Sequence, residues 1–189
     1  CGDSYCSSMH SKSWTTLLLK HYKAKVVNLG IEGACHERAI ESFDPSADIT
    51  FFVWTDPNRL VNRRKYPLNY ASARKGVLEK RGRTYQAALA YYEWLHDPKY
   101  AMKRQTRDLY WFDTKILSTY KKPIIHLWSF SKTYSFQHGI EFTTPLKVMY
   151  NYIPIAESNV LHLNHMTEAD NESLFNAIKT TIDSYVTVA

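Results

Sequence analysis

Three short patches that lie far apart in the chain carry the residue types of nucleophilic catalysis. Ser4 stands in Gly-Asp-Ser at the start, Gly30 and Gly33 follow the first apolar run, and His165 precedes the last amphipathic segment. A serine hydroxyl becomes a nucleophile when a base such as histidine lies within hydrogen-bond reach. Attack on a carbonyl also needs donors for the developing oxyanion, and glycine lets a backbone N–H approach closely. Taken together, the three patches hold the residue types that nucleophilic catalysis at a carbonyl uses, and we interpret them as one active site.

In this order and spacing, the patches resemble the SGNH/GDSL hydrolase family. That family has a Gly-Asp-Ser serine near the N-terminus, a glycine after the second strand, an asparagine after the third strand and a histidine just before the last helix. The resemblance covers most of the chain and implies Ser4 as nucleophile, the backbone N–H groups of Ser4 and Gly33 as oxyanion donors, and His165 as general base. It implies a structural role for Asp3. The implied activity is that of an esterase or deacetylase with an acyl-enzyme intermediate and no metal or other cofactor.

Two positions depart from the family pattern. Thr55 stands where the family has its oxyanion asparagine. A threonine hydroxyl donates one hydrogen bond, and Asn58 or the guanidinium of Arg59 are the alternative donors. His162 takes the place of the triad aspartate, three residues before His165, and competes with it as the base. Without a carboxylate to fix the tautomer of His165, we expect a Ser–His dyad.

The positive charge of the chain is concentrated in one segment. The net charge is +6, yet residues 59–83 hold nine cations against the single acid Glu79, which leaves the rest of the chain negative. A local patch of one sign suits a partner of the opposite sign. We therefore expect Arg59, Arg63 and Arg64 to contact an anionic or carbohydrate substrate, or an anionic polymer. The alternative is a solvated loop that aids solubility.

The apolar pattern predicts one α/β domain over residues 1–189. Apolar strands that alternate with amphipathic helices favour a three-layer α/β/α sandwich with a mostly parallel central sheet, which is also the flavodoxin-like fold that the resemblance implies. The segments expected to be strands are 25–29, 49–54 and 123–128. Those expected to be helices are 13–23, 34–43, 84–95, a further element around 109–120, and 167–185.

Three other segments complete this prediction. Residues 59–83 are expected to form a long loop, because Pro67 and Gly76 interrupt them, and 130–150 is ambiguous. Thr167 with Asp170 resembles a capping box at the start of the last helix. Because only Cys1 precedes the Gly-Asp-Ser motif, we expect the first central strand of the family to be absent or trimmed.

The remaining features of the sequence limit the classes of function that the chain can have. Three cysteines argue against a disulfide framework and for a reducing compartment; Cys6 is read as a buried thiol rather than a nucleophile. The chain contains no run of 18 apolar residues, the length that would indicate a membrane span. No secretory signal is visible either, so we expect a host-cell cytoplasm or a virion rather than secretion. The chain lacks a recognition-helix or RNP-type motif for nucleic acid. The alternative function is a catalytically weakened binding or structural module, such as a phage or viral particle component.

Overall fold

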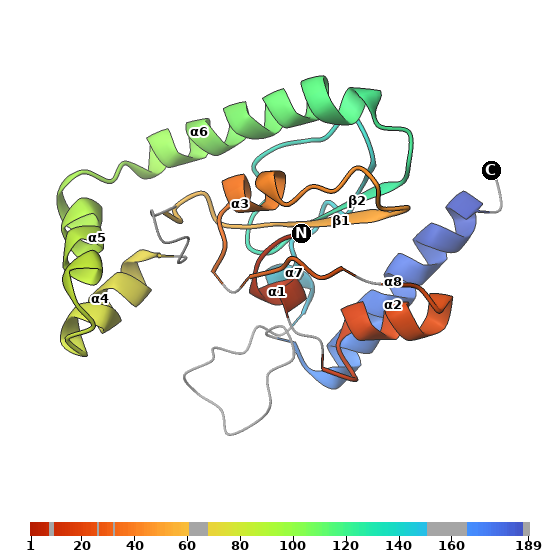
Figure 1. Cartoon of the computed structure of the whole chain (residues 1–189), viewed down its shortest axis with the longest axis horizontal. Helices are drawn as coiled ribbons and strands as arrows, with labels where there is room; N and C mark the ends of the chain where they lie inside the picture. Colours follow the sequence, from red (N-terminus) through yellow and green to blue (C-terminus); the bar gives the residue numbers. More distant parts are fainter. Residues whose placement is uncertain (8–9, 26, 32, 61–67, 151–165, 187–189) are drawn as a thin grey trace.

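The computed structural model describes residues 1–7, 10–25, 27–31, 33–60, 68–150 and 166–186. These residues form a mixed α/β structure in which helices surround a small parallel sheet (Figure 1). The sheet has the order β1-β2-β3, with β1 at Thr50–Trp54, β2 at Ile124–Trp128 and β3 at Ile140–Glu141. Strands β1 and β2 are apolar without alternation, and nearly all of their side chains are buried. This is the pattern of parallel strands that are covered on both faces.

The first two residues extend the sheet beyond β1. Gly2 forms parallel bridges with both Val53 and Gly30, and the N-terminal amine of Cys1 donates to the carbonyl of Phe51 at 2.8 Å. At Gly2, where φ is 154°, a Cβ would lie 2.7 Å from Val53 atoms, so the close approach requires glycine. Among the described residues, two single-residue parallel bridges therefore precede the three-stranded sheet, in the order Gly30, Gly2, β1, β2, β3.

Helices cover both faces of this sheet (Figure 1). On one face, α2 (Trp14–Tyr22) and α8 (Glu168–Val186) share a core with Val53 and Leu127. On the other, α3 (His36–Glu41) and α6 (Pro98–Trp111) share a core with Phe52 and Trp54. Two short helices, α1 (Ser4–Ser7) and α7 (Leu146–Met149), follow the ends of strand segments, and α6 continues into a π-helix at Phe112–Ile116 and a 3₁₀ turn at Leu117–Thr119.

A helical hairpin stands beside the sheet. Its two helices, α4 (Tyr70–Leu78) and α5 (Arg83–Trp94), pack against each other around Ala73 and Ala88 (Figure 1). The expectation of a loop over 59–83 is thus wrong for α4. A reciprocal capping box between Asn69 and Ser72 starts this helix. Gly76, which suggested a loop, is instead a helix contact, because a Cβ there would overlap the ring of Tyr85.

Most of the other predicted elements are confirmed to within a few residues. Helices α2, α3, α5 and α8 and strands β1 and β2 lie where the apolar pattern predicts them. The capping box before α8 is also confirmed, since Asp170 N donates to Thr167 Oγ1 and Thr167 N donates to Asp170 Oδ2, both at 3.1 Å. The strand expected at 25–29 is not found among its described residues, and only the bridge at Gly30 joins the sheet there.

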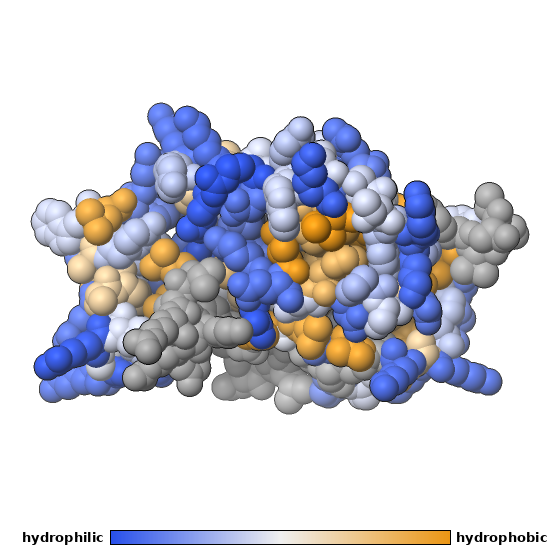
Figure 2. Space-filling view, turned by 45° about the horizontal axis from the view of Figure 1, so that its top comes forward, coloured by the Kyte–Doolittle hydropathy of each residue, from blue (hydrophilic) through white to orange (hydrophobic). Residues whose placement is uncertain are grey.

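The surface of the face that carries α3 and α6 is mostly hydrophilic, with hydrophobic side chains visible in its middle (Figure 2). Within the described part of the chain, none of the helices has the length and the apolar character needed to cross a bilayer.

Candidate functional site

The sheet brings several of the predicted site positions to one edge. Ser4 begins α1 directly after the Gly2 bridge, the turn at Gly33 follows the Gly30 bridge, and Thr55 follows β1. Because the three segments are parallel and adjacent, their carboxyl ends lie at the same edge. The Ser4 side chain lies outside what the structure describes, as do the complete residues Arg63, Arg64, His162 and His165.

Asp3, the residue before Ser4, is fully buried and joins several segments. Its Oδ1 accepts hydrogen bonds from the Tyr5 N–H at 3.0 Å and from the Ser129 hydroxyl at 2.9 Å. Its Oδ2 lies 3.5 Å from Nη1 of Arg59, an ion pair without hydrogen-bond geometry. The carboxylate therefore organises the strand ends, and nothing in this arrangement makes it a reacting group.

Arg59 lies inside the fold, although the sequence suggested that it contacts substrate. Only 6% of the residue is exposed. Its Nη1 donates to the carbonyl of Ala34 at 3.0 Å, and its guanidinium lies 5.1 Å from the ring centroid of Phe130, within cation–π range. The carbonyl of Arg59 accepts from Arg104 at 3.4 Å. The bond to Ala34 and the contact with Phe130 hold the guanidinium inside the fold.

Thr55 is the candidate oxyanion donor whose hydrogen bond is still available. The residue is 2% exposed, and its Oγ1 has no hydrogen-bond partner among the described residues. The backbone carbonyl of Thr55 accepts from Gln105 at 2.8 Å, which fixes the chain at this point. The Asn58 amide, in contrast, already donates to Asp56 Oδ1 at 2.8 Å. Because a buried hydroxyl without a partner is costly, Thr55 is the better candidate to serve a ligand.

The turn that carries Gly33 is held in place by backbone and side-chain bonds. Gly33 has φ 70°, in the left-handed region that favours glycine. The Ala34 N–H closes the turn onto the carbonyl of Ile31 at 2.9 Å. Asn28 then joins this part of the chain to α1, because its Nδ2 donates to the Cys6 carbonyl at 2.7 Å while its Oδ1 accepts from the Gly30 N–H at 2.9 Å.

Cys6 and Cys35 are buried thiols. Cys6 Sγ donates to the carbonyl of Asp3 at 3.2 Å. Burial raises the pKa of the Cys6 thiol to about 12, and burial with the nearby charge of Glu37 raises the pKa of Cys35 to about 12. Since the thiolate is the reactive form of cysteine, neither thiol is activated as a nucleophile.

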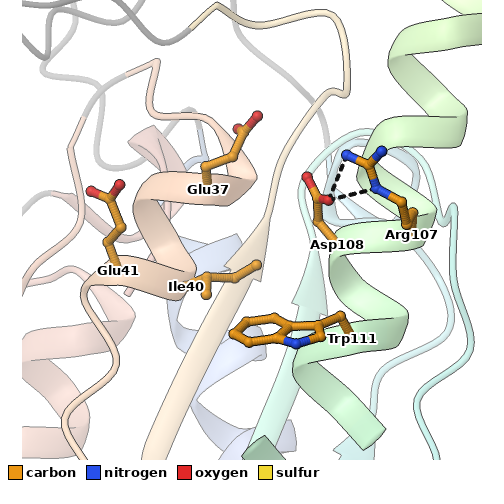
Figure 3. Close-up of a pocket in the computed structure, with 6 residues that line it drawn as sticks. All are labelled: Glu37, Ile40, Glu41, Arg107, Asp108 and Trp111. Atoms are coloured by element: carbon orange, nitrogen blue, oxygen red, sulfur yellow. Dashed lines mark hydrogen bonds and ion pairs between the residues drawn. The ribbon is translucent and has the colours of Figure 1, made fainter. Parts of the chain in front are cut away.

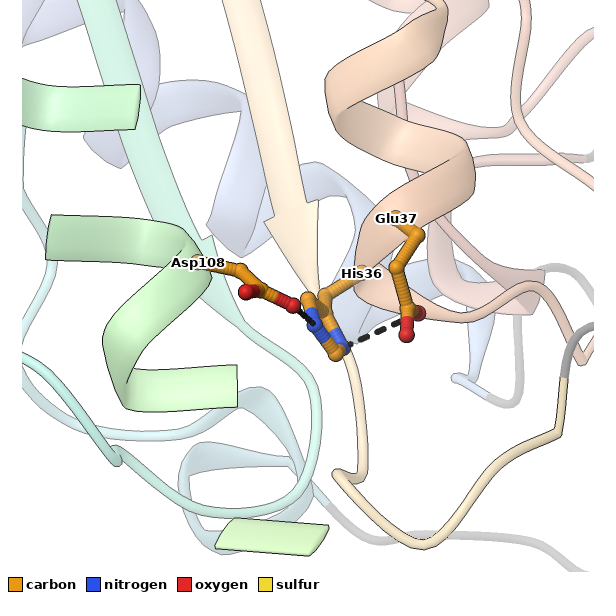
Figure 4. Close-up of side chains that lie close together, drawn as sticks. All are labelled: His36, Glu37 and Asp108. Atoms are coloured by element: carbon orange, nitrogen blue, oxygen red, sulfur yellow. Dashed lines mark hydrogen bonds and ion pairs between the residues drawn. The ribbon is translucent and has the colours of Figure 1, made fainter. Parts of the chain in front are cut away.

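A cluster of His36, Glu37 and Asp108 joins α3 to α6 (Figure 4). The fully buried His36 ring has Nε2 3.1 Å from Asp108 and Nδ1 3.2 Å from Glu37. Burial lowers the pKa of His36, although both acids oppose this effect. These are ligand types that bind metals, but Arg104 and Arg107 already pair with the two carboxylates at 3.3 and 3.1 Å. We therefore interpret the cluster as an ionic contact between the helices.

A pocket of about 410 Å³ opens on the outer side of this contact (Figure 3). Ile40 and the half-exposed ring of Trp111 point toward each other across it, and charged side chains surround them. The residues that line it are Glu37, Ile40, Glu41, Arg107, Asp108 and Trp111. None of these side chains carries a hydroxyl or a thiol. The sequence pattern gave no signal for this pocket, because its residues come from two helices that are distant in the chain.

Comparisons of this chain with protein-family models, with curated proteins and with solved structures find no match.

Proposed function

We propose that this chain is a serine hydrolase of the SGNH type that cleaves an ester or an O-acetyl group. The observation that supports this most strongly is the order of the parallel segments, Gly30, Gly2, β1, β2, β3. It matches the doubly wound, flavodoxin-like order, in which ligands bind at the carboxyl ends of the strands where the order reverses. In this chain the order reverses between Gly2 and β1. Ser4 lies two residues after Gly2, and Thr55 is the first residue after β1.

The proposed reaction has two steps. In the first, Ser4 Oγ attacks the ester carbonyl while His165 takes its proton, and His165 then protonates the departing alkoxide. In the second, water attacks the acyl-enzyme while His165 takes a proton from it, and the proton returns to Ser4 as the acid is released. The oxyanion of each tetrahedral intermediate accepts from the Ser4 and Gly33 N–H groups and from the Thr55 hydroxyl.

The proposed substrate class is an anionic or carbohydrate ester. Five exposed cations lie on the α4–α5 hairpin, namely Arg74, Lys75, Lys80, Arg81 and Arg83. The hairpin is attached to the loop after β1, since the hydroxyl of Tyr92 lies 2.7 Å from the carbonyl of Asn58 and 2.8 Å from that of Leu68. This attachment supports a role for the hairpin in holding substrate near the strand ends.

Labelling with a fluorophosphonate probe tests this function, because the probe reacts with an activated serine. We expect the wild-type protein to be labelled and to hydrolyse short-chain aryl esters, with mass spectrometry locating the label on Ser4. Ser4→Ala should abolish both signals. Ser184→Ala, which changes an exposed serine of α8, should keep both. A folded wild-type protein that is neither labelled nor active would instead be a binding or structural module on the same scaffold.

A further inference from the structure

We propose that the buried Asp3–Arg59 pair positions the Gly33–Ala34 turn against the turn that carries Ser4. The pair would thereby hold the two backbone donors of the oxyanion site at a fixed separation. Arg59 is in this view a positioning residue, and its effect on rate rests on the function proposed above.

The contacts of one guanidinium and one carboxylate connect four strand ends. Arg59 follows β1, and its Nη1 binds the carbonyl of Ala34 at 3.0 Å while facing Asp3 Oδ2 at 3.5 Å. Asp3 follows the Gly2 bridge, and it also accepts from Ser129, the residue after β2. If the side chain of Arg59 were removed, the Gly33–Ala34 turn would lose its side-chain link to Asp3.

A buried ion pair by itself adds little to the stability of a fold. Removing two charges from water costs several kcal/mol per ion, and apolar replacements of such pairs are often neutral or stabilising. What the pair supplies is direction, because the guanidinium is planar and its donors have fixed geometry. The guanidinium carbon lies 5.1 Å from the ring centroid of Phe130, and Arg104 donates to the backbone carbonyl of Arg59. Both contacts limit the movement of the Arg59 side chain.

Such precision matters at a site of this kind. A misplacement of about 1 Å in a catalytic arrangement costs on the order of 10²-fold in rate. Gly33 precedes Ala34 directly, so a shift of the Ala34 carbonyl is transmitted through two peptide units to the Gly33 N–H. Asp3 likewise precedes Ser4. One member of the pair, Asp3, is therefore the neighbour in sequence of Ser4, and the other, Arg59, binds the neighbour in sequence of Gly33.

Arg59→Met tests this inference, with Arg107→Met as the matched control because Arg107 pairs with Asp108 on the exposed side of α6. Three quantities are measured for each variant. They are kcat and KM for a small neutral aryl ester, hydrogen exchange at the Ile31 and Ala34 amides, and the midpoint of urea unfolding. We expect Arg59→Met to lower kcat by about 10²-fold with little change in KM, and to speed exchange at these two amides by about tenfold. Arg107→Met should change neither.

A double variant separates positioning from stability. Asp3→Asn/Arg59→Met leaves no unpaired buried charge, so it should be more stable than Arg59→Met alone while its kcat stays as low. It also provides a folded protein for the test where Arg59→Met fails to fold. Recovery of kcat together with stability, or unchanged exchange at Ile31 and Ala34, would overturn the inference. If the wild-type protein hydrolyses no ester, the proposed function fails, and the exchange measurement alone decides whether Arg59 holds the turn.

Discussion

The indole N–H of Trp54 donates a 3.0 Å hydrogen bond to Nδ1 of His126, and so links β1 to β2 through their side chains in the core. The proton of the His126 ring is then on Nε2, which donates to the carbonyl of His138 at 2.9 Å. Phe136 stacks on the ring with centroids 3.7 Å apart. The neutral imidazole thus uses both nitrogens, and burial lowers the pKa of His126 to about 4.

This arrangement predicts a loss of stability in mild acid. The ordinary pKa of histidine is 6.5, whereas His126 has a pKa of about 4 in the folded protein, so the unfolded chain binds more protons between these values. The contribution of the neutral His126 ring to the free energy of unfolding is fully present above pH 6.5. As the pH falls toward 4, the free energy of unfolding decreases by on the order of 3 kcal/mol. Urea unfolding at pH 7.5, 5.5 and 4.5 measures this change.

The variant His126→Gln keeps an acceptor for Trp54 but does not titrate. The variant should be less stable than the wild-type protein at pH 7.5. Between pH 6.5 and 4, its free energy of unfolding should decrease much less than that of the wild-type protein. Asp113, the charged group that faces His126 and opposes the lowered pKa, is unchanged in this variant. His21→Gln, at an exposed position of α2, serves as the control and should keep the wild-type dependence. An equally steep decrease in His126→Gln would assign the effect to other groups.

Thr55→Val should separate activity from stability. If Thr55 donates to the oxyanion, the variant loses up to about 10²–10³-fold in kcat. Its stability should stay the same or rise, because the lost Oγ1 has no partner among the residues that the structure describes and a methyl group of similar size replaces a buried polar atom. Hydrolysis rates and urea unfolding, measured side by side, check both parts.

Strand β1 offers a matched control for this change. Thr50, at the opposite end of the strand, is also buried, and its Oγ1 also lacks a partner within the described part of the chain. Thr50→Val should therefore have the same effect on stability and none on kcat. Thr55→Asn, which restores the amide of the resembled family, should keep or raise kcat. If Thr55→Val leaves kcat intact while Asn58→Ala lowers it, Asn58 is the donor.

The general base is tested by two histidine variants. The position just before the capped helix α8 favours His165, so His165→Ala should lower kcat by at least about 10²-fold, the usual size of a general-base contribution. His162→Ala should lower it much less. The rates of aryl ester hydrolysis decide the order, and the reverse order would make His162 the base. Small and similar losses in both variants would favour the binding or structural module.

The fold followed from the sequence where local pattern and tertiary environment agree. The uniformly apolar run at β1 can be stable only between two helical layers, and Thr167 caps α8 through a local bond with Asp170. The role of Arg59 could not be predicted in the same way. An arginine within a basic run resembles a surface residue, and only the folded chain brings it to Asp3, 56 positions earlier.

The same limit applies to Thr55 and to α4. The sequence assigned Thr55 as a donor because of its place in a motif, but the absence of a partner for its hydroxyl depends on every neighbour in the fold. Glycine usually signals a break in a helix, but in α4 Gly76 allows close contact with the ring of Tyr85. Such non-local causes leave no local pattern in the chain.

The basic α4–α5 hairpin is expected to attract anions. Arg74→Glu, Lys80→Glu and Arg83→Glu together reverse three exposed charges on α4, α5 and the turn between them. Because surface changes of this kind alter stability by only about 0.5 kcal/mol each, the triple variant should fold. We expect it to bind a polyanion such as heparin more weakly, or to have a higher KM for an anionic ester, while kcat for a neutral aryl ester stays the same.

Salt dependence and a second triple variant sharpen this test. Exposed charges are screened over about 10 Å at 0.1 M ionic strength, so the preference of the wild-type protein for anionic ligands should shrink as salt is added. Lys20→Glu, Lys103→Glu and Lys121→Glu reverse the same number of exposed charges outside the hairpin and control for net charge. If both triple variants weaken binding equally, net charge rather than the hairpin attracts the anion. If neither does, and salt has no effect, the hairpin cations are only solvated, and the proposed anionic substrate must be abandoned even where ester hydrolysis by Ser4 is observed.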